Sequence, residues 1–267
     1  MSFTNLLSLL TGSSFTTSSE DVLYLGANVR KPERPFLPWR TTALGDQGIT
    51  VDFGQGRQIA LVVLVNCNFT SARIEGTNNN AEWAGAPFSQ TVTIARNPRM
   101  WRYQHGVIVT GFAYRYMRIM IPDQTPVDGA TYYSLGGLWA GTIATMPRPW
   151  RWEVEYQTIE PREDAQPRHA GWRQRLALGE PFVRMIVRTH SRVNEAHPAQ
   201  DDQFEQWSDL ERQVHVSDFF VPVNEINGTY DTSQVLVVRR VNQSQWTSAG
   251  LGMLESTWEL EEVTGGT

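Results

Sequence analysis

Hydrophobic and polar residues alternate or gather in short apolar runs along most of this chain, and these patterns predict β-strands. Residues 49–53 alternate, a glycine-rich segment follows at 54–56, and an unbroken apolar run covers 59–65. The run is rich in β-branched residues, lacks a helical period and is far shorter than the ~20 residues of a membrane span. We therefore predict a strand at 59–65 that is buried on both faces of a β-sandwich, and a tight hairpin turn at 54–56 before it.

The rest of the first half carries further segments of this kind. Alternation at 72–76, 90–95 and 112–121 predicts strands, and turn-forming residues separate them. The segment 112–121 alternates best, with one face formed by Tyr114, Tyr116, Arg118 and Met120 and the other by Arg115, Met117, Ile119 and Ile121. Many short strands with turns between them are typical of an antiparallel sandwich or jelly roll.

Prolines at 147 and 149 indicate a domain boundary. We predict an N-terminal jelly-roll β-sandwich at 1–145 and a second β-rich domain at 146–267, so the expected fold class is mainly β. Apolar residues at helical spacing predict one short helix at 203–213, and residues 160–168 form a predicted polar loop. Predicted strands of the second domain are 153–159, 171–177, 182–187, 219–223, 234–241 and 257–263.

The composition excludes several functional classes. With 28 acidic and 23 basic residues the net charge is −5, which offers no positive surface for nucleic acid. Cys67 is the only cysteine, so no intramolecular disulfide or thiolate zinc site is possible, and we expect a buried, inert thiol. The sequence shows no signal-peptide pattern and no membrane span, so we expect synthesis in a cytoplasm.

No catalytic motif is apparent. The five histidines are scattered without H-x-x-x-H spacing, and no G-x-S-x-G segment is present. The obvious carboxylate pairs, Glu153 with Glu155 and Asp201 with Asp202, have the pattern of strand-face or loop charges. Asp123 and Asp128 flank a turn, but they lack the ligand spacing of a calcium site. We therefore predict a protein without enzymatic activity, cofactor or metal.

Three loops, at 31–42, 77–88 and 97–105, carry the residues suited to ligand binding. Aromatic faces stack on the C–H surfaces of sugars, and Asn and Arg side chains hydrogen-bond to sugar hydroxyls. The candidate glycan site consists of Trp39, Arg40, Asn79, Trp83, Trp101 and Tyr103. Alternatives remain open, because Trp39 can plug the sandwich, Asn-rich tips are ordinary turns, and the same residue types form protein interfaces.

Several landmarks occur in an order that resembles the galactose-binding-like jelly roll, also called the discoidin family, over residues 5–141. They are Trp39-Arg40, the segment VDFG at 51–54 with Arg57 to Ile59, the segment YMRI at 116–119, and LWAG at 138–141. The Glu that the family often carries in the last segment is absent, as are the two cysteines of many extracellular members. The resemblance implies a jelly roll made in a cytoplasm.

The whole chain is also similar to tail-tip or baseplate proteins of bacteriophages, including distal tail proteins. It opens with Asn-Leu-Leu at 5–7 and ends with a S-x-W-x-L-x-E segment at 256–262. This resemblance implies a virion protein at the tail tip, made in the host cytoplasm, which forms a homo-oligomeric ring between the tail tube and the hub or receptor-binding parts. Tube, hub and tape-measure proteins would be its partners, and the N-terminal arm or the loop 31–42 would reach a neighbour. The alternative is a carbohydrate-binding module that attaches the virion to cell-surface glycans.

Overall fold

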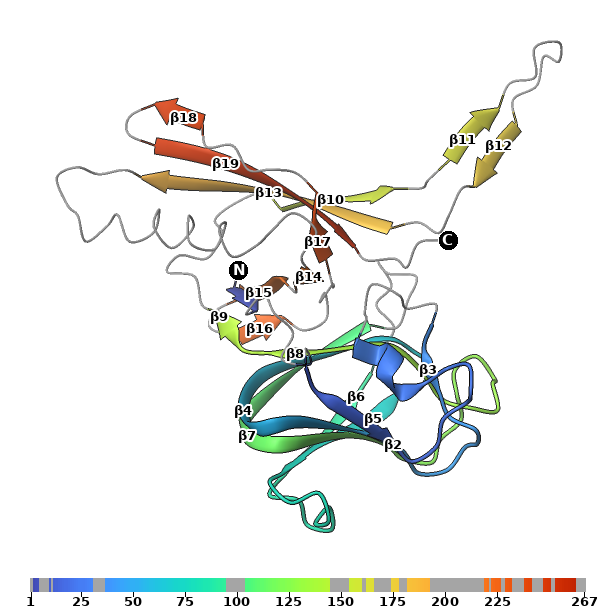
Figure 1. Ribbon diagram of the computed structural model, residues 1–267. Helices are drawn as coiled ribbons and strands as arrows, with labels where there is room; N and C mark the ends of the chain where they lie inside the picture. The colour runs from blue at the N-terminus through green and yellow to red at the C-terminus, as the bar shows by residue number, and fades with distance from the viewer. Residues whose placement is uncertain are drawn as a thin grey trace. The chain divides into compact units, whose positions relative to one another are not determined.

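The computed structural model is that of a mainly β protein (Figure 1), which confirms the predicted fold class. The helix predicted at 203–213 lies outside the residues that the structure describes. Within the described ranges, no helix has the length and apolarity needed to cross a membrane. The described residues are 2–4, 10, 12–30, 37–94, 104–144, 154–159, 162–165, 174–177, 182–192, 219–220, 222–226, 229–231, 238–241, 247–250 and 253–262.

The chain divides into two compact units. The first contains Met1–Pro149 and Phe219–Val237, and the second contains Trp150–Asp218 and Val238–Thr267. The predicted domain ranges, 1–145 and 146–267, stay a prediction.

A seven-stranded antiparallel sheet with the strand order β3-β8-β4-β7-β5-β6 forms the sandwich of the first unit, and β2 pairs with β4. A short 3-10 helix, η1 (Gly26–Arg30), follows β2. The strands are β2 (Ser14–Thr17), β3 (Trp39–Arg40), β4 (Gln47–Cys67), β5 (Ser71–Thr77), β6 (Phe88–Thr93), β7 (Gln104–Ile121) and β8 (Ser134–Gly141).

A four-stranded sheet in the same unit joins distant segments in the order β16-β15-β1-β9. Phe3 pairs with Pro222 on one side and with Ala144 on the other. The predicted N-terminal arm that reaches a neighbour is therefore wrong for residues 2–4, because both edges of this strand are paired within the chain. The strands are β1 (Ser2–Thr4), β9 (Ile143–Ala144), β15 (Pro222–Ile226) and β16 (Thr229–Asp231), and β14 (Phe219–Phe220) precedes β15.

The long strands β4 and β7 are each interrupted by a bulge. Residues 53–56 of β4 interrupt the register between Asp52 and Arg57, and residues 109–111 of β7 interrupt it opposite Ala60. Gly54 and Gly111 have φ angles of 74° and 80°, which glycine adopts without strain. The predicted hairpin turn at 54–56 is wrong, since β4 pairs with β7 on both sides of this bulge. The bulges bend both strands (Figure 1), which lets them contribute to both layers of the sandwich.

The apolar run is buried as predicted. Leu61 to Leu64 are all 0% exposed. Ile59, Val62 and Leu64 belong to the main core of the unit, whereas Leu61 and Val63 are buried outside that core cluster. A strand with both faces buried needs apolar residues at consecutive positions, which explains why no alternation is visible here. Cys67 is also buried, as predicted, and its Sγ donates a hydrogen bond of 3.8 Å to the carbonyl oxygen of Phe69.

The second unit contains a sheet in the order β10-β13-β19-β17, with β18 also paired to β19. Trp258 and Leu260 of β19 are buried, whereas Glu259 and Glu261 are partly exposed, so this strand alternates. The predicted polar loop at 160–168 is wrong in part, because residues 162–165 form β11, which pairs with β12. The strands are β10 (Val154–Ile159), β11 (Arg162–Ala165), β12 (Gln174–Ala177), β13 (Phe182–Arg192), β17 (Val238–Arg240), β18 (Thr247–Gly250) and β19 (Met253–Glu262).

Candidate functional site

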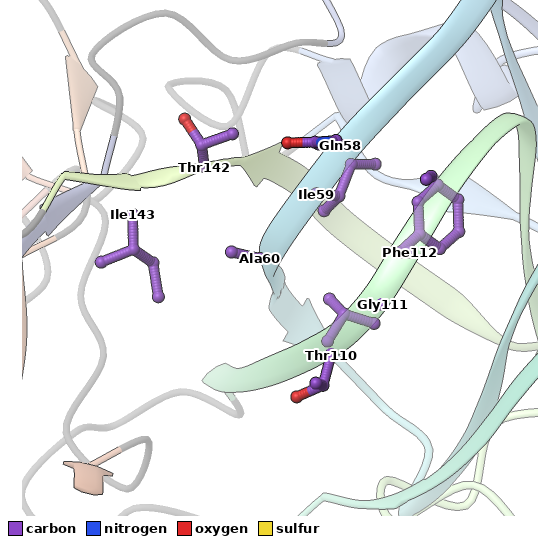
Figure 2. A pocket seen from close by; sticks show the side chains of 10 residues that line it. Gln58, Ile59, Ala60, Thr110, Gly111, Phe112, Thr142 and Ile143 are labelled. Atoms are coloured by element: carbon purple, nitrogen blue, oxygen red, sulfur yellow. The ribbon is translucent and has the colours of Figure 1, made fainter. Parts of the chain in front are cut away.

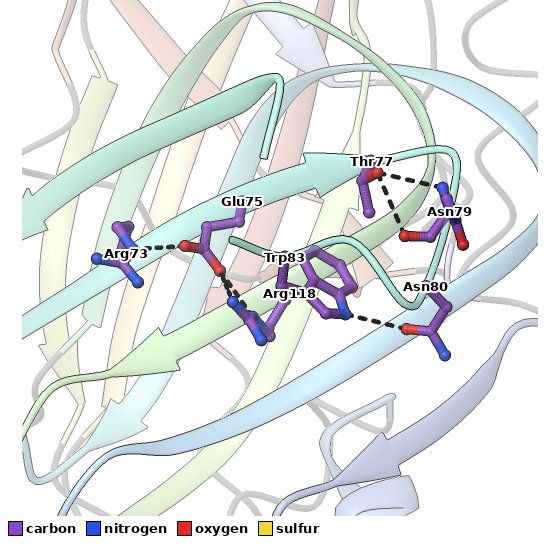
Figure 3. Close-up of polar contacts among 7 residues, drawn as sticks. All are labelled: Arg73, Glu75, Thr77, Asn79, Asn80, Trp83 and Arg118. Carbon is purple, nitrogen blue, oxygen red and sulfur yellow. Dashed lines mark hydrogen bonds and ion pairs between the residues drawn. The ribbon is translucent and has the colours of Figure 1, made fainter. Parts of the chain in front are cut away.

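A cluster of polar side chains lies on the outer face of β5 and β7 (Figure 3). Glu75 of β5 lies opposite Arg118 of β7 in the strand register. Arg73 precedes Glu75 by two residues, so strand alternation places both side chains on one face. The intervening Ile74 and the neighbouring Ile119 are buried in the core. The apolar positions of both strands thus fix which residues form this cluster.

Glu75 is the centre of the cluster and is only 3% exposed. Its Oε1 accepts a hydrogen bond of 2.6 Å from Nε of Arg73, and its Oε2 accepts one of 2.6 Å from Nε of Arg118. Hydrogen bonds between charged groups are short and strong, and they hold both guanidinium groups in place. Because two arginines share one carboxylate, these three side chains carry a net positive charge.

Trp83 in the loop between β5 and β6 covers Arg118. The guanidinium carbon of Arg118 lies 4.4 Å from the centroid of the indole, which is a cation–π contact. The indole Nε1 donates a hydrogen bond of 3.2 Å to Oδ1 of Asn80. Figure 3 shows Trp83 against Arg118 with Asn80 beside it. The ring therefore has a fixed orientation on the polar face of the sheet.

The predicted residue Asn79 shapes this loop. Its backbone N–H donates to Oγ1 of Thr77 at 3.1 Å, and its Oδ1 accepts from the N–H of Ala81 at 3.2 Å. Asn78 adds an anchor, because its Oδ1 accepts from the backbone N–H of Arg115 at 3.0 Å. Local side-chain to backbone bonds of this kind favour tight turns. Asn79 thus positions Trp83 through the turn.

Two groups in the cluster keep hydrogen-bonding capacity. The side-chain NH2 of Asn80 and the terminal amino groups of Arg73 donate no hydrogen bond to any residue in the described part of the chain. The Arg73 side chain is 46% exposed, so these donors meet solvent. An oriented aromatic ring beside an amide with an unused NH2, with the exposed guanidinium of Arg73 bound to the other oxygen of Glu75, is suited to a hydroxyl-rich ligand.

Trp39 does not offer its ring to a ligand. It is 0% exposed, and its Nε1 donates a hydrogen bond of 3.0 Å to the carbonyl oxygen of Ser19. Its strand pairs with β8, where Trp39 lies opposite Leu135, and the indole fills the core. The expectation of a ligand-stacking Trp39 is corrected accordingly, and the alternative that Trp39 plugs the sandwich holds.

Arg40 lies apart from the Trp83 loop. Its guanidinium is over the rings of Tyr24 at 3.7 Å and Tyr132 at 5.0 Å. The loop that carries Tyr132 is fastened near the first residue of β5, since Oε1 of Gln124 accepts from the N–H of Ser71 at 3.0 Å. The Trp83 loop instead follows the last residue of this seven-residue strand. The two loops thus adjoin opposite ends of a strand roughly 20 Å long.

The structure therefore separates the predicted site residues. Asn79 and Trp83 belong to the β5–β6 loop, Arg40 belongs to another surface, and Trp39 lies in the core. Trp101 and Tyr103 lie outside the described residues. Reasoning from sequence missed Glu75 and its arginines, although the alternation at 72–76 and 112–121 already placed these charges on the polar faces of two strands.

An open hollow of ≈ 540 Å³ lies beside the bulge of β7 (Figure 2). It occurs where the chain leaves β8 for β9, beyond the pair of Gly141 and Leu61. None of its lining residues is ionisable, so it offers little to orient a charged ligand. They are Gln58, Ile59, Ala60, Val109, Thr110, Gly111, Phe112, Ala113, Thr142 and Ile143.

No group of three or more His, Cys, Asp or Glu side chains suited to a metal ion occurs among the described residues. Asp128 instead fixes a loop, since its Oδ1 accepts 3.2 Å from Nδ2 of Asn68 and 3.1 Å from the N–H of Ala130. Burial raises the pKa of the Cys67 thiol to about 12. The Arg115 hydrogen bond lowers the pKa of the Asp52 carboxyl below its ordinary value.

Comparison with known proteins gives likenesses in structure alone. No family model and no curated protein matches the sequence. The lectin domain of lectinolysin complexed with Lewis B antigen is 13% identical, with a TM-score of 0.41 over 51% of this chain and 96% of its own. A Streptococcus pneumoniae fucose binding module is 14% identical, with a TM-score of 0.40 over 51% of this chain and 95% of its own. The family 32 CBM from C. perfringens NanJ in complex with galactose is 15% identical, with a TM-score of 0.40 over 52% of this chain and 98% of its own. Because these identities and TM-scores are low, the likenesses carry no argument about what this chain binds.

Proposed function

We propose that the first unit is a carbohydrate-binding module and that its glycan site is the Trp83 cluster, defined as Arg73, Glu75, Asn80, Trp83 and Arg118. The observation that carries the proposal is the fixed indole of Trp83, 4.4 Å from the guanidinium of Arg118 and hydrogen-bonded to Asn80. A ring that is already oriented loses little conformational entropy when a ligand binds to it.

In the proposed complex, the apolar face of a sugar ring lies on Trp83. The free NH2 of Asn80 and the terminal amino groups of Arg73 donate hydrogen bonds to sugar hydroxyls. Glu75 has a positioning role, because its Oε2 holds Arg118 under the indole and its Oε1 holds Arg73.

A glycan array tests the proposal. We expect the wild-type protein to bind a defined subset of glycans, and Trp83→Ala to reduce the affinity for them at least about tenfold, as for a central aromatic contact. Asn80→Ala should weaken binding less, because it removes one donor and the acceptor of the indole N–H but leaves the ring and its contact with Arg118. The control is Leu23→Ala, which removes an exposed apolar side chain outside the cluster and should bind like the wild type. Absence of glycan binding, or a Trp83→Ala profile equal to that of the wild type, would refute the proposal.

A second candidate is a structural component of a phage tail tip or baseplate, which oligomerises in a ring. It rests on the sequence resemblance and on Val22 and Leu23, which are 85% and 72% exposed, as is typical of residues that contact another protein. Negative-stain microscopy of tails assembled with tagged protein tests this role. A ring at the tail tip would support it, and a protein that stays monomeric and never joins a tail would refute it. Both roles are compatible in one virion protein.

A further inference from the structure

The turn 21–24 presents apolar side chains in an unusual place. Oδ1 of Asp21 accepts a hydrogen bond of 2.9 Å from the N–H of Leu23, and the carbonyl of Asp21 accepts one of 3.0 Å from the N–H of Tyr24. Turn tips of this type normally carry polar residues or glycine. Here the tip carries Val22 and Leu23, 85% and 72% exposed, on a well-built turn. Their exposure therefore results from an ordered backbone.

Arg40 lies next to this turn. The N–H of Arg40 donates to the carbonyl of Tyr24 at 3.1 Å, and the N–H of Asp21 donates to the carbonyl of Arg40 at 2.9 Å. On the other side, Nδ2 of Asn68 donates to the carbonyl of Tyr132 at 3.0 Å, which holds the backbone of the tyrosine whose ring lies 5.0 Å from the guanidinium carbon. The backbone of the two tyrosines is thus held in place from both sides of Arg40.

The guanidinium of Arg40 has no carboxylate partner among the described residues. Its Nε is buried and has no hydrogen-bond acceptor, and no hydrogen bond or ion pair joins its terminal amino groups to another residue in the described ranges. The terminal amino groups are not fully buried, and the residue is partly exposed. By contrast, Arg73, Arg115 and Arg118 each bind a carboxylate. A rigid, unpaired guanidinium is a strong binding site for an anion.

We infer that Val22, Leu23, Tyr24, Arg40 and Tyr132, here called the Arg40 surface, dock a protein segment in which one Asp or Glu lies between aliphatic residues. Arg40 would bind the carboxylate through its terminal amino groups, and Val22 and Leu23 would contact the aliphatic side chains. The second candidate function also invoked this turn. The inference requires only that the turn contacts another protein, and it does not require that protein to belong to a phage tail.

A peptide fits this surface better than an acidic sugar does. Exposed Val and Leu side chains gain free energy when they bury aliphatic groups, about 25 cal/mol per Å² of apolar area. A sugar presents mainly hydroxyl groups, which would lose water without gaining a partner on these side chains. The positive charge of Arg40 thus selects a carboxylate, and the apolar turn selects aliphatic groups on either side of it.

The test uses the full-length protein labelled with ¹⁵N and two matched tetrapeptides. The probes are acetyl-Leu-Glu-Val-Leu-amide and acetyl-Leu-Gln-Val-Leu-amide, which differ in one carboxylate. We expect the Glu peptide to shift the Arg40 ¹⁵Nε–H signal in a saturable way, and the Gln peptide to bind at least about tenfold more weakly because it lacks the charged partner. Arg40→Lys assigns the signal by abolishing it. The affinity of this variant, followed through the backbone N–H signals of Val22 and Leu23, should be at least about tenfold lower, because a lysine lacks the planar fork.

Further variants separate the outcomes. Leu23→Ser alters an exposed side chain, so it keeps the fold and should still weaken peptide binding several-fold. Arg57→Lys changes an exposed arginine elsewhere and should have no effect.

Glucuronic acid tests the other source of a carboxylate. If it shifts the Arg40 signal at the same or a lower concentration than the Glu peptide, the inference is overturned in favour of an acidic glycan. No shift with any probe, or equal shifts with both peptides, also overturns it. Trp83→Ala should leave peptide binding unchanged, so failure of the glycan proposal would not affect this result.

Discussion

Glu75 and Arg118 face each other across β5 and β7, with 2.6 Å between Oε2 of the carboxylate and Nε of the guanidinium. The carboxylate is nearly inaccessible to solvent, and Arg118 lies under the indole of Trp83. The guanidinium of Arg118 therefore stabilises the sheet through Glu75 and also orients the indole of Trp83, on which the sugar is proposed to lie.

We predict that Glu75→Gln destabilises the protein by about 3 kcal/mol, because removing one partner of a buried ion pair leaves the other charge uncompensated. Urea unfolding monitored by circular dichroism measures the effect. The matched control is Glu82→Gln, an exposed carboxylate in the Trp83 loop, which should change stability by less than about 0.5 kcal/mol. Equal effects of both substitutions would show that the pair contributes nothing specific.

The buried thiol of Cys67 should make the protein sensitive to alkali. Burial raises its pKa from 9.0 to about 12, so the folded state disfavours the thiolate. The thiol then ionises in the unfolded chain before it ionises in the folded one. Stability should therefore decrease as the pH rises from about 9 toward 12, by up to about 1.4 kcal/mol per pH unit.

Urea unfolding at pH 8 and pH 10 tests the thiol, with Cys67→Ala as the comparison. The variant loses buried volume and should be less stable at pH 8, but its stability should change less between the two pH values. A thiol reagent should also react with the native protein far more slowly than with the unfolded protein. The same pH dependence in both proteins would exclude Cys67 as its source.

Asp52 should have the opposite effect in acid. Its hydrogen bonds from Nε and Nη2 of Arg115, at 2.8 and 2.9 Å, lower the pKa of its carboxyl. The ion pair stabilises the fold above the unfolded pKa near 4, and this contribution should be lost as the pH falls through the lower folded value. Because both side chains are partly exposed, solvent screening should keep this contribution small. Asp52→Asn should flatten the stability profile between pH 5 and pH 2, and a parallel profile would contradict this.

The bulge of β4 should depend on Gly54. Its φ of 74° is unfavourable for residues with a Cβ, although a Cβ there would meet nothing within 4 Å. Gly54→Ala should therefore cost about 1–2 kcal/mol through backbone strain alone. Gly56→Ala in the same bulge provides the control, since its φ is not positive and the nearest atom to an added Cβ is the carbonyl oxygen of Ala113 at 3.8 Å. Chemical denaturation measures the free energy of unfolding of both variants. An equal loss in Gly54→Ala and Gly56→Ala would show that backbone strain at Gly54 is not the cause.

The sequence was most informative where apolar patterning determines burial. The run at 59–65 and the alternation from Met117 to Ile121 predicted strands and core faces that the structure contains. The bulge at 54–56 could not be predicted, because glycines favour a hairpin turn and a bulge alike, and only the pairing with β7 distinguishes them.

The candidate site was predicted only in part for a similar reason. Trp83 and Asn79 are loop residues whose type suggested a ligand, and the structure places them in one loop. The positions of Trp39 and Arg40 depend on pairing between β3 and β8, which residue type does not reveal. Glu75 was overlooked because a charged residue in an alternating strand normally faces solvent, whereas here two arginines and the Trp83 loop enclose it.

The most direct test of the glycan site is a titration of ¹⁵N-labelled protein with the glycan that binds best on the array, followed through the tryptophan indole N–H signals. We predict that the Trp83 signal shifts and saturates, whereas those of Trp39 and Trp139, which are 0% and 1% exposed, stay in place. A glycan that saturates the protein while the Trp83 signal remains unchanged would contradict the proposed site.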